Sequence, residues 1–466
     1  MALRFFNTLT QQSEEFQPLE PPLVRMYTCG PTVYHYVHIG NFRTFSFQDI
    51  LRRWLRYRGY QLLHVMNITD VEDKIIRNAM ARNLSIAEYT AEYEKAFLDD
   101  SALLRLERPE RVVRATEHIQ EMVDAVKSLA DGGHTYQSDG STYFRIASFP
   151  EYGRLSRLHF DGMQAGARVD VDEYEKDDAR DFVLWKGRKE GEPYWESPFG
   201  QGRPGWHIEC SAMANKYLGS TLDIHTGGID LTFPHHENEI AQAECVNHKP
   251  FSRFWLHAEH LIVEGQKMSK SLGNFFTLRD IFERGFSPEA IRYRLVAVPY
   301  RNKLNFTFAD LEAAETAIER LRNFELRLKT TKFSEGQSAE ISDRARRALA
   351  DFENHMDDDL NTAAALGVIF EYVRVANAAM DAGSFFSANV EEALDLLQRF
   401  DQIFDILKPT RKDSDLSDEE VDALIAERQQ ARQSRNFKRS DEIRDELAAK
   451  GVILEDTRDG VRWKRK

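Results

Sequence analysis

The sequence predicts an α/β protein: a Rossmann-like parallel-sheet catalytic domain with an insertion, then an α-helical bundle and a small mixed α/β C-terminal module. Near the start, an apolar run at 23–30, a helical pattern at 42–57 and a second apolar run at 61–68 follow one another. Such a strand–helix–strand unit closes right-handed into a parallel sheet and leaves a ligand crevice at the carboxyl ends of its strands. After Asn305 the chain becomes rich in Ala, Leu, Glu and Arg with helical spacing.

The elements expected after the first unit divide the catalytic domain in two. Residues 85–129 are expected to be mostly helical, and the Gly- and Pro-bearing stretch up to Pro204 reads as short strands and loops inserted into the sheet. The sheet is expected to resume at 221–226, followed by a Gly227-Gly228 turn, a helix opened by Pro234 and a strand at 260–263. The insertion therefore splits the nucleotide-binding fold.

Five regions are predicted along the chain. They are the first half of the catalytic domain (1–115), the inserted connective region (116–205), the second half of the catalytic domain (206–304), the helical bundle domain (305–410) and the C-terminal module (411–466).

The composition favours a soluble protein with several domains. The 466 residues, 42% hydrophobic and 30% charged, can bury several cores. Residues 1–16 contain Glu14 and Glu15 and lack an apolar signal core, and no later segment is expected to reach the length of a bilayer span, so we expect a cytoplasmic location. Three cysteines are too few for a disulfide framework and fit metal binding or catalysis better. A net charge of -14 argues against a protein that coats nucleic acid without selectivity.

The tetrapeptide His38-Ile39-Gly40-Asn41 follows the first predicted strand, where the helix begins. Backbone N–H groups and the positive end of the helix would face a bound anion there, and a triphosphate would fit. Gly40 allows close approach, while His38 and Asn41 could donate hydrogen bonds to phosphate oxygens. An ordinary surface histidine beside a helix-start asparagine remains the alternative.

A second motif, Lys267-Met268-Ser269-Lys270-Ser271, lies between Gly265 and Gly273. Glycines on both sides indicate a mobile loop, whose two lysines could reach the β- and γ-phosphates and stabilise a pyrophosphate leaving group. A solvated basic turn is the alternative interpretation.

Together these two motifs resemble the HIGH and KMSKS motifs of class I aminoacyl-tRNA synthetases. The resemblance implies that His38, Gly40 and Asn41 bind ATP, with Mg²⁺, and that Lys267 and Lys270 stabilise the transition state of adenylation. Asn41 replaces the final histidine of the usual motif, which leaves that phosphate contact open.

Four further residues carry metal-binding side chains. His235 and Glu239 are four apart at the start of a predicted helix, hence on one face. Cys29 ends the first strand, and Cys210 precedes Ser211, a plausible helix N-cap whose dipole would lower the thiol pKa, so both thiols could be ionised. Two thiolates, an imidazole and a carboxylate best match Zn²⁺. The alternative is two buried apolar cysteines and a capped surface pair.

Four segments resemble cysteinyl-tRNA synthetases specifically. They are Tyr27-Thr28-Cys29-Gly30-Pro31-Thr32-Val33-Tyr34, Asn67-Ile68-Thr69-Asp70, Gly205-Trp206-His207-Ile208-Glu209-Cys210 and Phe233-Pro234-His235-His236-Glu237-Asn238-Glu239. The resemblance places one zinc in the amino-acid pocket, where it would select the cysteine thiolate over the serine hydroxyl, with Glu239 the ligand expected to loosen. It also makes Thr69 and Trp206 pocket walls, although Trp206 alone would fit a core residue. Cys245 and His236 are expected to be structural or stay unassigned.

The C-terminal region combines basic and aromatic residues. Arg432, Arg435, Lys438 and Arg439 lie near Phe437, and Trp463 lies in the basic tail. This mixture suits single-stranded RNA, because cations meet phosphates and rings stack on unpaired bases; a solvated helix face is the alternative. Segments 437–444 and 451–456 resemble the family's anticodon-binding module, which implies tRNA contacts by Arg432, Asp441 and Trp463.

The combined hypothesis is a monomeric cysteine–tRNA ligase that converts L-cysteine and ATP to cysteinyl-adenylate and transfers the cysteine to tRNA(Cys). One alternative is the mycothiol-pathway ligase that joins cysteine to an amino sugar, which lacks the long helical and anticodon portions. The other is a non-catalytic paralogue that binds RNA or senses cysteine, against which the intact Lys267, Lys270 and metal-ligand candidates argue.

Overall fold

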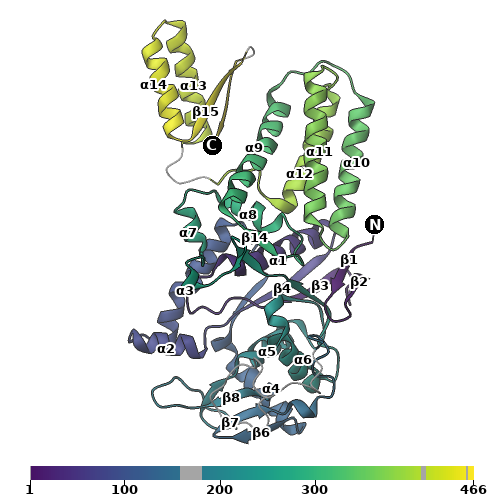
Figure 1. Ribbon diagram of the computed structural model, residues 1–466, viewed down its shortest axis with the longest axis vertical. Coiled ribbons are helices and arrows are strands. Elements are labelled where there is room, and N and C mark those ends of the chain that lie inside the picture. Colours follow the sequence, from purple (N-terminus) through teal and green to yellow (C-terminus); the bar gives the residue numbers. More distant parts are fainter. Residues whose placement is uncertain (1, 158–180, 411–415, 458–459, 466) are drawn as a thin grey trace.

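The computed structural model describes residues 2–157, 181–410, 416–457 and 460–465. Figure 1 shows the sheet domain in the middle of the long axis, with the inserted region below it. The helical bundle and the C-terminal module lie above the sheet domain, at the other end of the molecule. The helical bundle and the C-terminal module thus share one end of the molecule, and the inserted region lies at the other.

The central sheet has five strands in the order β11-β10-β3-β4-β5, all of them parallel. The strands are β3 (Leu23–Thr28), β4 (Gln61–Ile68), β5 (Arg111–Arg114), β10 (Leu222–Gly228) and β11 (Ser252–Ala258). The predicted parallel-sheet fold is confirmed. The helices that cover this domain are α1 (Ile39–Tyr57), α2 (Asp73–Ala81), α3 (Ile86–Leu103), α5 (Trp206–Leu218) and α6 (His235–Asn247). A hairpin of β1 (Arg4–Asn7) and β2 (Gln12–Glu15) lies beside β11.

The stretch 85–129 is mostly helical, as expected, through α3, η1 (Ala115–His118) and α4 (Ile119–Asp131), but the short strand β5 forms within it. Neither β5 nor the edge strand β11 was expected. Both strands pair with neighbours distant in the sequence, and β5 has only four residues, so its local pattern is weak. Gly227 and Gly228 form the end of β10 and not a turn.

The inserted region forms its own small sheet next to α4 (Ile119–Asp131). Its antiparallel strands are β6 (Thr135–Ser138), β7 (Ser141–Phe144), β8 (Phe182–Gly187) and β9 (Gly202–Pro204), in that order. β9 ends one residue before the N-cap of α5, so the insertion leads directly into the second half of the catalytic domain.

A three-stranded sheet, in the order β13-β12-β14, follows β11. It consists of β12 (Leu261–Val263), β13 (Gln266–Lys267) and β14 (Leu304–Phe306). The short helix η5 (Lys270–Leu272), α7 (Leu278–Phe282) and α8 (Pro288–Val296) lie between β13 and β14 in the sequence.

The helical bundle packs on the catalytic domain through a shared core. Its helices are α9 (Phe308–Thr330), α10 (Ala339–Asp357), α11 (Thr362–Asp381) and α12 (Ala388–Phe404). One cluster of buried residues contains Trp54 of α1 together with Phe352 of α10 and Phe400 of α12. Helix α11 is long and apolar enough to cross a membrane by those two criteria alone, which corrects the expectation that no segment reaches that length. It packs against α10 in the bundle, as a core helix of a soluble protein also would.

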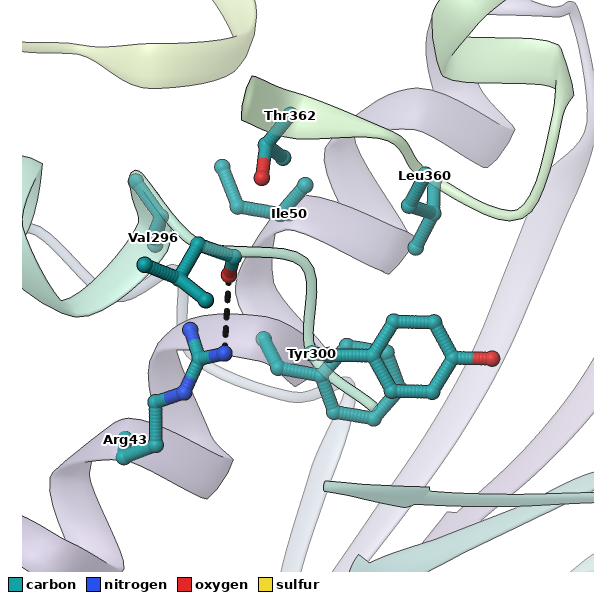
Figure 2. A pocket seen from close by; sticks show the side chains of 8 residues that line it. Arg43, Ile50, Val296, Tyr300, Leu360 and Thr362 are labelled. Carbon is teal, nitrogen blue, oxygen red and sulfur yellow. Dashed lines mark hydrogen bonds between the residues drawn. The ribbon is translucent and has the colours of Figure 1, made fainter. Parts of the chain in front are cut away.

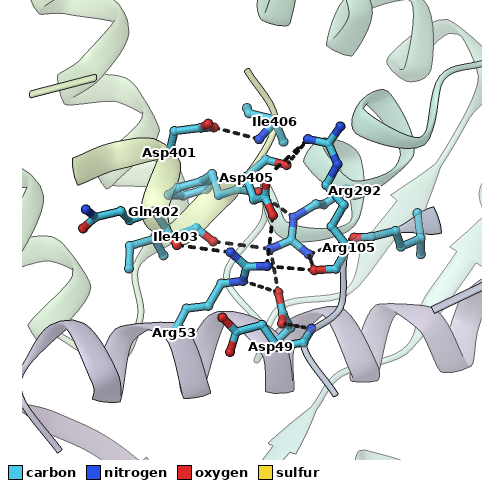
Figure 3. Close-up of polar contacts among 12 residues, drawn as sticks. Asp49, Arg53, Arg105, Arg292, Asp401, Gln402, Ile403, Asp405 and Ile406 are labelled. Carbon is cyan, nitrogen blue, oxygen red and sulfur yellow. Dashed lines mark hydrogen bonds and ion pairs between the residues drawn. The ribbon is translucent and has the colours of Figure 1, made fainter. Parts of the chain in front are cut away.

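A partly buried polar network, the junction cluster, joins the bundle to the catalytic domain (Figure 3). The junction cluster comprises Asp49, Arg53, Arg105, Arg292 and Asp405. The guanidinium of Arg292 donates to Asp49 Oδ2 at 2.6 Å and to the backbone oxygens of Phe404 and Leu104. Arg53 donates to both aspartates, at 2.8 and 3.1 Å. The end of α12 is thereby fastened to α1 and α8.

A small cavity lies beside this junction, between α1, the end of α8 and the start of α11 (Figure 2). Its lining includes Ile50, Tyr300 and Leu360, and Arg43 extends along it to donate to Val298 O at 2.8 Å. The lining is apolar where it is exposed to the cavity and shares no residue with the cysteine and histidine cluster described below. The cavity is therefore a packing defect near the junction.

The C-terminal module contains α13 (Asp418–Gln433), α14 (Phe437–Ala449) and an antiparallel hairpin of β15 (Val452–Thr457) and β16 (Gly460–Arg465). Val421, Ile425, Ile443, Leu447 and Val452 form its core. This agrees with the predicted small mixed α/β module. The bounds of the five predicted regions themselves stay predictions.

Candidate active site and metal centre

Four side chains with metal-binding atoms converge at the carboxyl end of the central sheet. Cys29 directly follows β3, Cys210 lies in α5, and His235 and Glu239 lie in the first two turns of α6. One sulfur, nitrogen or oxygen atom from each residue lies within 4.8 Å of the others. We call these four residues the metal cluster. The structure thus brings together all four residues that were predicted from the sequence as metal ligands.

The metal cluster is closely packed and buried. His235 Nε2 lies 2.9 Å from Glu239 Oε1, and Cys29 Sγ lies 3.6 Å from the same oxygen and 4.0 Å from Cys210 Sγ. The exposed fraction of each residue is between 0% and 7%. Two sulfurs, a nitrogen and an oxygen at such short separations are the donor set that fits a zinc ion.

Electrostatics in the metal cluster differ from the sequence-based expectation. Cys210 lies within α5, whose N-cap is Gly205, so Ser211 is not a helix cap and the helix dipole argument was wrong. Burial raises the pKa of Cys210, but hydrogen bonds from Cys29 and interaction with His235 bring it down to about 6. Burial raises the pKa of Cys29 well above its ordinary value, so without a cation only one thiol ionises readily.

The other two members of the cluster are charged. Burial opposes ionisation of Glu239, yet the neighbouring His225 and His235 hold its pKa at about 2. Burial likewise opposes protonation of His235, but Glu239 and Cys210 raise its pKa to about 10. The pocket concentrates acidic groups that a bound cation would balance.

Three buried histidines surround the metal cluster: His207 and His225, to which no role was assigned from the sequence, and His236, which was expected to be structural or unassigned. His225 Nε2 lies 2.9 Å from Glu239 Oε2, and His236 Nε2 lies 3.3 Å from Cys29 Sγ, so these two complete a second donor set with Cys29 and Glu239. His207 Nδ1 lies 2.8 Å from His235 Nδ1, which leaves Nε2 of His235 facing the cluster. Contacts of this kind orient metal ligands. The signal available in the sequence was His225 in an apolar strand and His236 adjoining His235.

Trp206 and Thr69, the two predicted pocket walls, make different kinds of contact near this cluster. The Trp206 ring stacks on the His235 ring, with centroids 4.2 Å apart and an interplanar angle of 26°. Thr69 is buried, and its hydroxyl donates to Glu209 Oε2 at 2.9 Å while accepting from Asn67 Nδ2 at 3.2 Å. Gly30 is required here, because a Cβ on it would lie 1.8 Å from the Asn67 carbonyl oxygen.

The tetrapeptide 38–41 forms the start of α1. His38 is the N-cap, and its Nδ1 accepts from the backbone N–H of Asn41 at 3.3 Å, which leaves the side chain of the exposed Asn41 outside this cap. Burial lowers the pKa of His38, which favours the neutral imidazole needed for this cap. A Cβ on Gly40 would lie 2.7 Å from Cε of Met268, so the tetrapeptide approaches the second motif closely.

The second motif lies between β13 and η5. Lys267 is exposed and ends β13, and η5 begins at Lys270. The side chain of Lys270 lies outside the part that the structure describes. Gly265 and Gly273 have positive φ values of 75° and 66°, a backbone conformation that glycine adopts without strain.

The predicted tRNA contacts lie on the C-terminal module. Arg432 is exposed in the last turn of α13, and Asp441 is exposed on α14. Trp463 on β16 donates from Nε1 to Asp422 Oδ1 at 2.9 Å, so its indole is tied to α13. Phe437, not selected among these contacts, has an exposed fraction of 61% and adjoins Lys438.

Comparisons with known proteins agree with this arrangement. Three family models match: the tRNA synthetases class I (C) catalytic domain over residues 15–316, the DALR domain over 351–408, and the cysteinyl-tRNA ligase anticodon binding domain over 414–463. Among solved structures, methionyl-tRNA synthetase of Mycobacterium tuberculosis with methionyl-adenylate is similar, with a TM-score of 0.62 and 15% identity over 82% of this chain and 92% of that chain. The fold and the catalytic-domain match define a class I aminoacyl-tRNA synthetase.

Curated relatives narrow the class to one family. The cysteine–tRNA ligase of Solibacter usitatus (strain Ellin6076) is 64% identical over 466 residues, covering 100% of both chains. The cysteine–tRNA ligase of Koribacter versatilis (strain Ellin345) is 54% identical, again over 100% of both. The chain belongs to the cysteine–tRNA ligase family, which confirms the resemblance and the enzyme class inferred from the motifs. The match to the anticodon-binding model favours this family over a ligase that lacks that portion.

Proposed function

We propose that this chain forms cysteinyl-adenylate from L-cysteine and ATP and transfers the cysteine to tRNA(Cys), using a zinc ion that selects the cysteine thiolate. Cys29, Cys210, His235 and Glu239 would hold the ion, and the single observation that carries this proposal is their convergence within 4.8 Å in a buried pocket. When bound, the zinc would supply a strong affinity for a thiolate that a serine hydroxyl does not match. A pocket that relied on shape alone would separate such near-isosteres by only about 10- to 200-fold.

The chain's own residues would orient the amino acid beside this ion. Trp206 stacks on His235 and would cover the pocket, and Thr69, fixed by Asn67 and Glu209, would form its polar wall. Holding the substrate carboxylate in one orientation would bring it in line with the α-phosphate of ATP.

ATP, with Mg²⁺, would lie against the start of α1. The helix N-terminus, with Gly40 allowing close approach, would attract the phosphates, and His38 and Asn41 would donate to them. A carboxylate oxygen of cysteine attacks the α-phosphorus, and pyrophosphate leaves as its bond to that phosphorus breaks. Lys267 and Lys270 would stabilise the charge that develops on the pyrophosphate.

In the second step, a hydroxyl of the tRNA 3′-terminal ribose attacks the cysteinyl carbonyl and AMP leaves. Arg432, Asp441 and Trp463 would contact the anticodon region, since they lie in the module that matches an anticodon-binding model. We further propose that the protein acts in the cytoplasm and as a monomer. Size measurement of the purified chain with and without tRNA can test the oligomeric state.

The deciding experiment is ATP–pyrophosphate exchange with cysteine and with serine, together with zinc analysis of the purified protein. We expect exchange with cysteine only and about one zinc per chain, as a single four-ligand site requires. The Cys210→Ser variant should lose both zinc and exchange. Vigorous cysteine-dependent exchange by a zinc-free Cys210→Ser protein would refute selection by the metal.

A further inference from the structure

We propose that Asn274 is a positioning residue that sets the shape of the lysine-bearing loop, residues 265–273. Its side-chain amide connects two parts of this loop. Oδ1 accepts from the backbone N–H of Ser269 at 2.8 Å, and Nδ2 donates to the backbone oxygen of Lys267 at 3.2 Å. The inference rests on the proposed function, because it assigns Asn274 to the placement of Lys267 and Lys270 during adenylation.

The first part of this loop is also held by strand pairing, because Gln266 and Lys267 pair with Val263 and Ile262 of β12 and the Gly265 N–H donates to Asn305 Oδ1 at 2.8 Å. The part that follows Lys267 has fewer such contacts. Residues 264–267 and 271–273 are exposed, and the loop begins and ends near glycines with positive φ. Within the described residues, the other hydrogen bonds inside it are Leu272 N to Ser269 O at 3.2 Å and a contact between the hydroxyls of Ser269 and Ser271 at 2.7 Å. The Asn274 amide holds the backbone on both sides of Met268, so it fixes how the chain leaves β13 at Lys267 and turns towards Lys270.

The segment after Asn274 is anchored to the start of α1. The backbone N–H of Ile39 donates to Phe276 O at 3.0 Å, and His38 pairs with Thr277 in an antiparallel bridge. The ring of His38 also packs edge-on against Phe275, with centroids 4.9 Å apart. Asn274 therefore links the loop to the helix end that would hold the triphosphate, through three residues of chain.

Only an amide of this length can make both contacts. The Lys267 carbonyl requires a donor and the Ser269 N–H requires an acceptor, and the asparagine side chain presents one of each. Asn274→Asp keeps the size and the acceptor but turns the donor into a second acceptor that faces a carbonyl oxygen. Asn274→Gln keeps both groups on a longer arm, so partial recovery is expected from it.

The test measures each step of the reaction separately in Asn274→Asp, Asn274→Ala and Asn274→Gln. Misplacement of a catalytic group by about 1 Å can cost about 100-fold, so we expect the kcat of cysteine-dependent exchange to fall about 10- to 100-fold in the Asp and Ala variants. The KM for cysteine and the rate of transfer from preformed cysteinyl-adenylate to tRNA should change by less than about twofold, because neither uses the loop. Asn302→Asp, the same substitution at an exposed asparagine outside the loop, is the control.

A second readout needs no activity. Trypsin should cut after Lys267 and Lys270 faster in Asn274→Asp than in the unsubstituted chain or Asn302→Asp, because the loop loses its internal bridge. Unchanged exchange kcat together with unchanged cleavage in Asn274→Asp would overturn the inference, as would equal losses in exchange and in transfer. If the proposed function is wrong, the unsubstituted protein will lack cysteine-dependent exchange. The trypsin comparison would still test the role of Asn274 in the loop.

Discussion

The metal cluster and the junction cluster are both polar and assembled from distant parts of the chain, but their charges are balanced in opposite ways. The junction cluster joins three guanidinium groups to two aspartates, and Arg105 also pairs with the Glu289 carboxylate at 2.6 Å. Other N–H groups donate to backbone oxygens such as Phe404 O and Leu104 O. The metal cluster joins two thiols and a carboxylate to one imidazole. The first is complete with protein atoms alone, whereas the second has more acidic groups than its cation can balance.

The two clusters also differ in whether buried polar atoms lack hydrogen-bond partners. Around the metal cluster, the buried His225 Nδ1 and Glu209 Oε1 have no hydrogen-bond partner within the described structure. No side-chain nitrogen or oxygen of the five junction residues falls in that category among the residues described. Buried polar groups are normally satisfied, so a pocket that departs from this rule marks a place for a ligand, while a satisfied network marks a structural contact.

Removal of a predicted ligand from the metal cluster should have the largest effect. Cys29→Ala takes away one sulfur and should reduce bound zinc to near zero per chain. Cysteine-dependent exchange should fall by about 10⁴-fold, the scale of losing a specific polar partner in a pocket. The metal-free variant should remain folded, because the chain around Cys29 is held by the parallel sheet. Zinc analysis, exchange kinetics and circular dichroism measure the three effects.

The control for this change is Cys245→Ala, which alters a half-buried cysteine outside the metal cluster. It should keep both zinc and exchange. Retention of zinc and of exchange by Cys29→Ala would show that the pocket does not depend on the four predicted ligands.

Only part of the predicted ligand set follows from the chemistry and spacing of the residues. His235 and Glu239 share a helix face by their spacing, but nothing local links them to Cys29 or Cys210, which are brought together by the order of strands β3 and β10. Resemblance to a family supplied that link. Glu209 and His225 were missed because a buried acid or histidine has no signature of its own in a helix or strand.

The same limit applied to the fold. β4 was predicted at its observed bounds, because an apolar run between Gly59 and a polar loop is a strong local signal. β5 and β11 were missed because they depend on pairing with strands remote in the sequence. The junction cluster was invisible for the same reason, since its arginines look like ordinary surface residues of helices until α12 covers them.

Removal of a junction arginine should affect stability and leave the metal cluster intact. Arg292→Met leaves the Asp49 carboxylate with one partner fewer in a buried site and should cost about 3–5 kcal/mol in free energy of unfolding, the usual cost of breaking a buried ion pair. Zinc content and exchange per folded molecule should stay unchanged, because the junction cluster contains no residue of the metal cluster. Denaturant unfolding measures the stability.

Arg374→Met serves as its control, since that arginine is exposed and pairs with Glu371 along one helix. It should change the free energy of unfolding by at most about 1 kcal/mol. Equal, small effects of the two substitutions would show that the junction cluster is not a stabilising contact.

A buried histidine near the junction cluster should make the free energy of unfolding depend on pH. Burial lowers the pKa of His64 to about 3, helped by the adjacent Arg52, whose Nη1 lies 3.0 Å from His64 Nδ1. In the unfolded chain this histidine takes up a proton near its ordinary pKa of 6.5, whereas in the folded chain it stays neutral until about pH 3. Between these values the unfolded state binds more protons, so stability falls as the pH falls, by up to about 1.4 kcal/mol per pH unit.

His64→Gln replaces the titrating ring with a neutral group that can still accept from Arg52 and donate to Thr28, which the ring contacts at 2.9 Å through Nε2. Its free energy of unfolding should therefore decline less steeply than that of the unsubstituted chain from about pH 6.5 to about pH 4.5, by up to about 1.4 kcal/mol per unit. Urea unfolding at several pH values measures the slope, and His260→Gln, at an exposed histidine, should leave it unchanged. An identical slope in His64→Gln would show that His64 does not cause the acid sensitivity in this pH range. The lowered pKa of a carboxylate such as Asp49 cannot mimic the effect, because it acts only at pH values below its ordinary pKa of 3.8.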